Sequence, residues 1–167
     1  MNSAEQLCPS CGLCCNGVLF GDVELQPGDD AQRLAAEGLT VLRRKGKQIF
    51  NQPCACLVGG LCGIYKDRPV RCRTFDCRTL IRLQDGKVSL AQAQKTVASA
   101  REQAAEVQRL LRLLGNTEEH LPLSRRYAAV MAQPVDLAAG EAHSELLGEL
   151  MLAVARLGDV LQRDFLV

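Results

Sequence analysis

The cysteines of this 167-residue chain are its most constraining feature, because all nine of them lie between positions 8 and 77. The remaining residues, 78–167, contain none. A disulfide framework usually needs an even number of cysteines and an oxidising compartment, so the odd count argues against one. We therefore divide the chain into a cysteine-rich metal-binding lobe, residues 1–88, and a helical region packed on it, residues 89–167.

The hydrophobic and turn-residue patterns predict an α+β fold that is mostly α, with short strands in the cysteine-rich lobe and a three-helix C-terminal layer. Turn-forming residues throughout positions 1–20 predict a loop there. Further along the lobe we expect a strand at 18–25 and a brief helix from Pro27 to Gly38. A hairpin should follow at 39–50, turning at Lys45-Gly46-Lys47, and then at most one helical turn near Pro69. A second hairpin is expected at 79–88, turning at Asp85-Gly86.

Three helices are predicted in the C-terminal region. After Ser89, a good N-cap, apolar residues recur at alternating three- and four-residue steps up to Gly115. A second helix is expected to begin around 117–124 and to end before Pro134, and a third to span about 140–163. Short connections favour antiparallel neighbours, so these helices should pack as a layer.

Charge and hydropathy disfavour several kinds of partner. The 20 Lys and Arg residues nearly balance the 19 Asp and Glu residues, so the net charge of +1 gives no electrostatic reason to expect nucleic acid or a membrane surface. No stretch reaches the roughly 18 apolar residues that a membrane span needs. The first residues lack an export signal, and we expect a cytoplasmic protein. The C-terminal helices are a candidate surface for a protein partner.

The spacing of the cysteines indicates metal binding. Cys8, Cys11 and Cys14 form two CxxC steps in series, which suits three corners of a 4Fe-4S cluster with a distant cysteine as the fourth ligand. Zn²⁺ bound by two sulfurs from this loop and two from later cysteines is an open alternative, and the set is large enough for two centres. Cys15 should face another centre or the interior, because neighbouring side chains diverge in a turn.

Basic residues accompany the later cysteines. Between Cys54 and Arg82 the chain has six Lys and Arg residues against two Asp residues, within a nearly neutral protein. Such charges would compensate a thiolate-bound centre of negative charge and would lower the pKa of nearby thiols. A patch for anions or nucleic acid is the rival interpretation, which the lack of interleaved aromatic residues disfavours.

Two sequence blocks carry a resemblance to a known family. Cys8-Pro9-Ser10-Cys11-Gly12-Leu13-Cys14-Cys15 is followed by Cys56-Leu57 and then by Cys62-Gly63-Ile64-Tyr65-Lys66-Asp67-Arg68-Pro69-Val70-Arg71-Cys72-Arg73-Thr74-Phe75-Asp76-Cys77. Together they resemble the YkgJ-type cysteine-cluster family of zinc- or iron-chelating CxxCxxCC proteins. The resemblance implies eight metal ligands, which are Cys8, Cys11, Cys14, Cys15, Cys56, Cys62, Cys72 and Cys77. Cys54 lies outside the pattern, either as an adventitious thiol or as an alternative ligand.

Other residues of the motif are expected to surround the bound group. Tyr65 should pack against the cysteine loops, and Arg68 should donate hydrogen bonds to a sulfur or to a loop carbonyl. Arg71 belongs to the basic residues that would compensate the charge of the bound group. Pro69 would fix the turn before Cys72, and Phe75 would exclude water.

These observations predict a metal-binding protein that coordinates an iron-sulfur cluster, with 4Fe-4S favoured, or Zn²⁺, in a redox, sensing or auxiliary role. A structural zinc module for protein–protein interaction is one alternative. An iron-sulfur enzyme is another, because the resembling family includes a flagellin lysine-N-methylase with a 4Fe-4S centre. The sequence leaves enzymatic activity open: His120 and His143 lie in helical, cysteine-free sequence, and no Gly-rich adenosylmethionine loop is recognisable.

Overall fold

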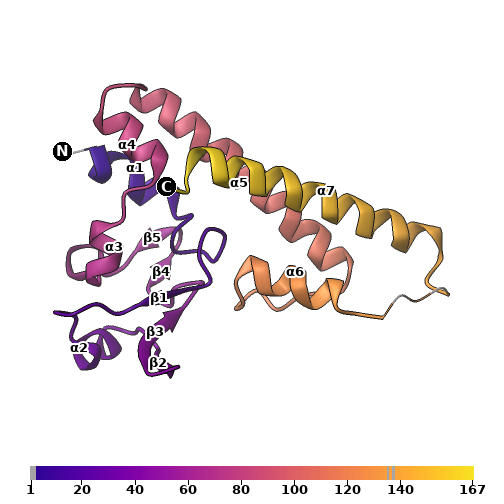
Figure 1. Ribbon diagram of the computed structural model, residues 1–167, viewed down its shortest axis with the longest axis horizontal. Coiled ribbons are helices and arrows are strands. Elements are labelled where there is room, and N and C mark those ends of the chain that lie inside the picture. The colour runs from indigo at the N-terminus through magenta and orange to yellow at the C-terminus, as the bar shows by residue number, and fades with distance from the viewer. Residues whose placement is uncertain (1–2, 135, 137) are drawn as a thin grey trace.

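Helices make up most of the fold, and small sheets accompany them at the cysteine-rich end (Figure 1). The computed structural model describes residues 3–134, 136 and 138–167. Its long helices α5 (Leu90–Leu113) and α7 (Gly140–Asp164) pack against each other and extend away from the cysteine-rich part, with α6 (Leu123–Met131) beside α5. This arrangement confirms the predicted fold class, mostly α with short strands.

The start of α5 lies where the sequence predicts it. Ser89 and Gln92 form a capping box, in which the Gln92 N–H donates to the Ser89 hydroxyl and the Ser89 N–H donates to the Gln92 side chain. These bonds satisfy N–H groups that have no partner inside the helix. Towards the other end of α5, the buried residues Val107, Leu111 and others pack against α6 and α7, forming the core of the helical layer.

The first cysteines lie on a helix, α1 (Ser3–Cys11), so the loop predicted for residues 1–20 is wrong over this stretch. Residues 1–2 of that predicted loop lie outside the described residues. Turn-forming Pro9 and Gly12 suggested a loop, but the apolar side chain of Leu7 is 2% exposed and packs into the core beside α5. Tertiary burial therefore stabilises a helix that local propensity does not favour.

A three-stranded antiparallel sheet follows, with β3 (Lys47–Asn51) between β1 (Asp22–Glu24) and β2 (Val41–Arg44). The hairpin turns at Lys45-Gly46, as predicted, and both residues have the positive φ angles of a tight primed turn. The short helix α2 (Ala31–Ala36), capped by Asp30, covers this sheet through Leu34.

The second cysteine-rich segment is mostly turns and very short elements. A two-stranded hairpin joins β4 (Leu57–Val58) to β5 (Leu61–Cys62), and a 3₁₀ helix η1 (Tyr65–Asp67) and the single turn of α3 (Val70–Thr74) come next. The position of α3 agrees with the predicted helical turn near Pro69.

The hairpin predicted at 79–88 is wrong, because this segment begins with a helix, α4 (Arg78–Gln84). Asp85 caps the end of that helix and Gly86 leaves it with φ of 68°, so the Asp-Gly pair ends a helix instead of turning a hairpin. Leu80, 1% exposed, anchors α4 in the core.

The helical region and the cysteine-rich part share one hydrophobic cluster. Its buried members come from α1 and the loop after it, from α4 and α5, and from the end of α7; they are Leu7, Leu13, Leu80, Ala93, Val97, Ala100, Val160 and Phe165. The backbone N–H of Arg78 donates to the Phe165 carbonyl at 3.1 Å, and the Thr79 hydroxyl donates to the Asp164 carbonyl at 2.6 Å. The boundary between residues 88 and 89 stays a prediction.

Among the described residues, no helix is long and apolar enough to cross a membrane.

Candidate metal centre

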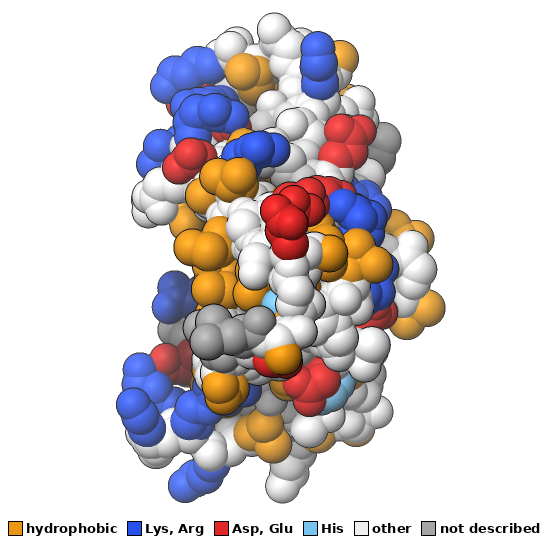
Figure 2. All heavy atoms as spheres, turned by 90° about the vertical axis from the view of Figure 1, so that its right-hand side faces the viewer, with side chains coloured by type: hydrophobic (Ala, Val, Ile, Leu, Met, Phe, Trp, Pro, Cys, Tyr) orange, Lys and Arg blue, Asp and Glu red, His pale blue; other side chains and the backbone are white. Residues whose placement is uncertain are grey.

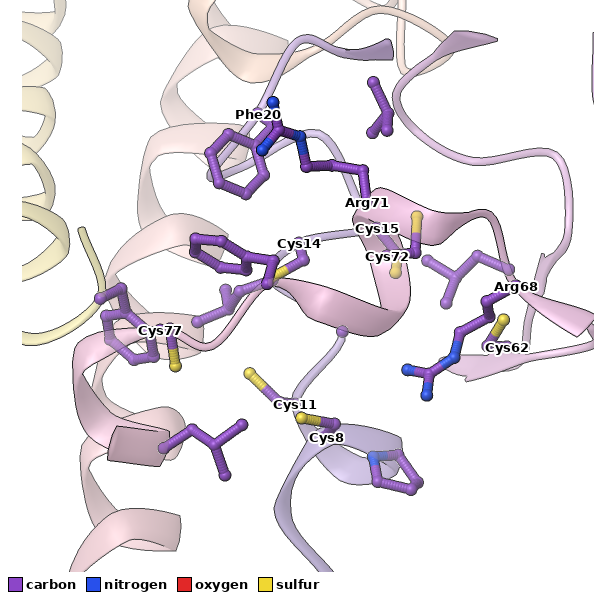
Figure 3. Close-up of a pocket in the computed structure, with 18 of the residues that line it drawn as sticks. Cys8, Cys11, Cys14, Cys15, Phe20, Cys62, Arg68, Arg71, Cys72 and Cys77 are labelled. Atoms are coloured by element: carbon purple, nitrogen blue, oxygen red, sulfur yellow. The ribbon is translucent and has the colours of Figure 1, made fainter. Parts of the chain in front are cut away.

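Seven of the nine cysteines line one cavity of about 490 Å³ (Figure 3). They come from α1 and the loop after it, from β5, from α3 and from the residue that precedes α4; they are Cys8, Cys11, Cys14, Cys15, Cys62, Cys72 and Cys77. All nine cysteines are free thiols. The fold therefore collects sulfur atoms from well-separated stretches of the chain.

Helix α1 and its exit turn position the first four thiols. Cys8 and Cys11 are three residues apart, so they share one face of α1. Gly12 has φ of 70°, and its carbonyl accepts the N–H of Cys15 at 2.9 Å, which closes a tight turn. This turn brings Cys14 and Cys15 back to the cavity reached by the helix.

The later thiols are held by short elements with firm anchors. Cys62 pairs with Leu57 in the β4–β5 hairpin. Helix α3, which carries Cys72, is fixed at its start, where the Val70 N–H donates to the Asp29 carboxylate at 2.8 Å. Cys77 is the N-cap residue of α4, and that helix is anchored by the buried Leu80.

Cys54 and Cys56 stand outside the residues that line the cavity. The Cys56 side chain is 6% exposed within the core of the three-stranded sheet, and its thiol donates to the Glu37 carbonyl at 3.4 Å. The Cys54 N–H donates to the Cys15 carbonyl at 2.7 Å. Of the eight cysteines implied by the family resemblance, the structure thus brings seven to the cavity and buries Cys56 in the core of the three-stranded sheet.

Burial raises the pKa of six cavity thiols, those of Cys8, Cys11, Cys14, Cys15, Cys72 and Cys77, so these six are neutral at pH 7 when nothing is bound. The pKa of Cys8, Cys11 and Cys15 is raised to about 11, and that of Cys72 to about 12. The Arg68 charge lowers the pKa of three of these thiols, but desolvation outweighs it. The net shift is therefore opposite to the lowering predicted from the basic sequence around the later cysteines.

Arg68 and Tyr65 form a local pair at the cavity wall. The Arg68 Nε donates to the Tyr65 carbonyl at 2.8 Å, and the guanidinium lies 3.7 Å from the centroid of the Tyr65 ring. Arg71 also lines the cavity, whereas Arg78 and Arg82 reach the C-terminal end of α7 and contact the Arg163 carbonyl and the Asp164 carboxylate. Two of the six basic residues in this segment thus line the cavity.

Two aromatic residues that line the cavity, Phe20 and Phe165, and one basic residue near Cys11, Arg101, escaped the sequence prediction. Phe20 packs edge-to-face on Phe75, with ring centroids 5.1 Å apart, and both rings line the cavity. Phe165, from the far end of the chain, lines it as well. Arg101 on α5 donates to the Ser10 carbonyl at 2.8 Å and lowers the pKa of Cys11, against the larger effect of burial. In the sequence, only the helical periodicity of α5 could have predicted that Arg101 faces the cysteines. No pattern in the sequence near Phe165 predicts its position at the cavity.

The donor set fits a thiolate-bound metal or cluster. Thiolates are the ligands that zinc and iron-sulfur clusters prefer, and the cavity offers seven thiols that can become such ligands around a volume larger than one ion needs. In the part of the chain that the structure describes, no three Cys, His, Asp or Glu side chains are yet closed around a common point. Closure therefore requires the sulfur atoms to draw together within the cavity.

Comparison with known proteins gives one match. A family model named CxxCxxCC, described as "Putative zinc- or iron-chelating domain", matches residues 7–106, which is more than half of the chain and includes all nine cysteines. No curated protein and no solved structure matches the chain. By the extent of this match, the chain belongs to the CxxCxxCC family.

Proposed function

We propose that this protein binds an iron-sulfur cluster, with 4Fe-4S favoured, or Zn²⁺ through the thiolates of the cavity, in a redox, sensing or auxiliary role. The observation that carries the proposal is the convergence of seven thiols on one cavity. A chain that needed these cysteines only as small apolar residues would have no reason to gather them around one hollow space.

The raised pKa values of the buried thiols support a site that binds a metal cation. They argue against a site that holds thiolates when no metal is bound. Burial holds the pKa of Cys8 and Cys11 at about 11, so the metal-free thiols keep their protons at pH 7. A bound metal replaces these protons, and the resulting thiolates are stabilised by its positive charge. The cationic side chains of Arg68 and Arg71 at the cavity wall then offset the excess negative charge of the complex.

The cluster is favoured over a single zinc ion by the local arrangement of the ligands. Cys8, Cys11 and Cys14 come from one continuous stretch, and Cys77 joins them from the start of α4, the three-plus-one pattern that suits a cubane. The rings of Phe20 and Phe75 give this cavity apolar walls. Low exposure to water is one of the factors that tune the potential of an iron-sulfur cluster.

Anaerobic purification followed by analysis of iron, acid-labile sulfide and zinc tests the proposal. We expect a brown protein with iron and sulfide in equal amounts, whose visible absorption bleaches on addition of dithionite. If the purified protein is colourless and contains zinc alone, the bound metal is zinc and not an iron-sulfur cluster. A protein that remains folded without metal, and whose seven cavity thiols all react with iodoacetamide, would refute metal binding.

A structural zinc module that presents its helices to a protein partner is the second candidate. The observation in its favour is a set of exposed apolar side chains on helices α5, α6 and α7, which are Leu113, Met131, Met151 and Leu152. Figure 2 shows hydrophobic side chains among charged ones on the side where α6 and the start of α7 lie. Zinc without sulfide, together with unchanged metal content under dithionite, would favour this candidate.

A further inference from the structure

We propose that a second pocket, between the cysteine loop and helices α5 and α6, binds a small tetrahedral oxyanion, inorganic phosphate or sulfate, at Arg126. The pocket has a volume of about 110 Å³. Its lining residues come from the loop after Cys15, from α5, from the α5–α6 connection and from α6; they are Asn16, Gln108, Glu119, Leu121, Leu123 and Arg126. None of these six is a cysteine, so this site is separate from the candidate metal centre.

The Arg126 guanidinium is a buried cation without an anionic partner. Arg126 is 2% exposed, on the face of α6 that packs into the molecule. In the part of the chain that the structure describes, no carboxylate forms an ion pair with it. Arginine is rarely buried in this way, because its desolvation is costly unless an anion compensates the charge. A bound oxyanion would supply the missing counter-charge.

One nitrogen of this guanidinium is available to a ligand. Arg126 Nε donates to the Asn116 side-chain oxygen at 2.9 Å, and Nη2 donates to the Asn116 carbonyl at 3.0 Å. Nη1 has no hydrogen-bond partner among the described residues. The two bonds to Asn116 therefore fix the guanidinium at the wall of the pocket and leave Nη1 to an acceptor from outside the chain.

Two neutral side chains add further donors to the pocket wall. The Val18 N–H donates to the Asn16 side-chain oxygen at 3.1 Å, which engages this oxygen and leaves the amide nitrogen of Asn16 available. The half-buried Gln108 lines the pocket from α5, and its side chain has no hydrogen bond to another described residue. An oxyanion has several acceptor oxygens, so it can accept from both amides and from the guanidinium at once.

The arrangement of the donors favours a tetrahedral ion over a carboxylate. Arginine commonly holds a carboxylate through two parallel N–H groups, and in Arg126 the pair formed by Nε and Nη2 is taken by Asn116. The remaining donors come from three segments of the chain, which suits an ion whose oxygens point in different directions. The pocket is also smaller than the roughly 300–1,000 Å³ of sites for larger organic ligands.

Glu119 is the lining residue that opposes an anion. Its Oε1 accepts from Arg112 Nε at 2.9 Å, and its side chain is 61% exposed. The Arg112 charge and the surrounding water therefore offset much of the repulsion. Since some repulsion remains, removing this carboxylate should strengthen anion binding.

The pocket lies where the cysteine loop meets the helical layer. Asn16 directly follows Cys15, and the Leu123 N–H, at the start of α6, donates to the Gly17 carbonyl at 2.9 Å. This bond already joins two walls of the pocket. A bound oxyanion would add a second link between the cysteine loop and α6, because it would accept hydrogen bonds from both.

Isothermal titration calorimetry of sodium phosphate into the full-length protein, purified anaerobically, tests the site. Sodium chloride keeps the ionic strength constant, so that screening is the same throughout the titration. We expect saturable binding of one phosphate per chain, competition by sulfate, and no measurable binding of acetate. Metal analysis before and after the titration should give equal values, which shows that the heat does not come from extraction of metal by phosphate.

Three variants locate the binding. Arg126→Gln should weaken phosphate binding about tenfold or more, because it removes the cation and a charge-assisted hydrogen bond. Arg125→Gln is the matched control, since Arg125 is the exposed neighbour on α6, and it should bind phosphate like the parent protein. Glu119→Gln should tighten binding about two- to fivefold.

Gln108→Ala keeps the inference testable if Arg126→Gln fails to fold. Alanine is a good helix former, and this change should weaken phosphate binding about threefold. Gln94→Ala is its control, because Gln94 is an exposed glutamine of the same helix, and it should leave the affinity unchanged.

Several results would overturn the inference. They are the absence of saturable phosphate binding to the parent protein, an affinity that neither Arg126→Gln nor Gln108→Ala lowers, and weaker binding by Glu119→Gln. Acetate binding as tight as that of phosphate would overturn the choice of a tetrahedral ion. Because no lining residue is a cysteine, each of these results leaves the proposed metal binding unaffected.

Discussion

Phe165 gives the sharpest test of how the C-terminal end of the chain supports the cysteine cavity. This side chain is 1% exposed and packs in the cluster shared by α1, α4, α5 and α7, and it also lines the cavity. Its backbone carbonyl accepts the N–H of Arg78, next to Cys77. Phe165→Ala removes the ring but leaves this backbone hydrogen bond possible.

We expect Phe165→Ala to lower the free energy of unfolding by about 3 kcal/mol. Phenylalanine-to-alanine changes in protein cores cost about 3–5 kcal/mol, from lost burial and from the space left behind. We use the lower end of this range because Phe165 lies at the edge of a cavity of about 490 Å³, where the neighbouring side chains can relax into the space left behind. The loss should also raise the reactivity of the neighbouring Cys77 thiol.

Urea unfolding of the metal-free protein under reducing conditions, followed by circular dichroism, measures this loss. Val167→Ala is the matched control, because Val167 lies two residues away and is 80% exposed; it should change stability by less than about 0.5 kcal/mol. A loss below about 1 kcal/mol for Phe165→Ala, with unchanged alkylation of Cys77, would refute the anchoring role of the ring.

Three further outcomes are expected. Ser89→Ala removes the N-cap of α5 and should cost about 1 kcal/mol, seen as a lower thermal midpoint. Thr79→Val leaves the buried Asp164 carbonyl without its hydroxyl donor, and should cost about 1–3 kcal/mol in urea unfolding. Since burial raises the pKa of Cys8 and Cys11 from 9.0 to about 11, these thiols stabilise the metal-free fold below pH 9, and this contribution is lost as pH rises towards 11. Urea midpoints at several alkaline pH values should therefore fall, and less steeply in a variant that lacks both thiols; equal slopes would contradict this reasoning.

Local signals were sufficient to predict some elements of the fold. The capping residue Ser89 and the apolar periodicity after it predict α5, and the structure shows that helix beginning at the next residue. The Lys45-Gly46 turn predicts the β2–β3 hairpin, because Gly46 readily adopts one of the two positive φ angles that this turn needs. In both cases the residues that decide the structure are neighbours in sequence.

Elements that depend on distant contacts were predicted wrongly. The predicted loop around Pro9 contains helix α1, and the predicted hairpin at 79–88 begins with helix α4. Both helices are short, and their buried residues Leu7 and Leu80 pack in a cluster that includes residues from the far end of the chain. The pattern within a short segment carries no information about such partners.

The same distinction applies to the cavity. Cysteine spacing predicts that the thiols converge, but the position of Phe165 and the burial of Cys56 depend on how α7 and α2 close over them. The family match ends at residue 106, inside α5, and so includes Ala93, Val97 and Ala100, the face on which α1 and α4 pack. The end of α7 lies beyond that match, yet it completes the cluster that holds Cys8, Cys11 and Cys77. The positions of Cys8, Cys11 and Cys77 therefore depend on a segment that carries no cysteine, and we expect metal binding at these thiols to be coupled to the packing of the C-terminal helix.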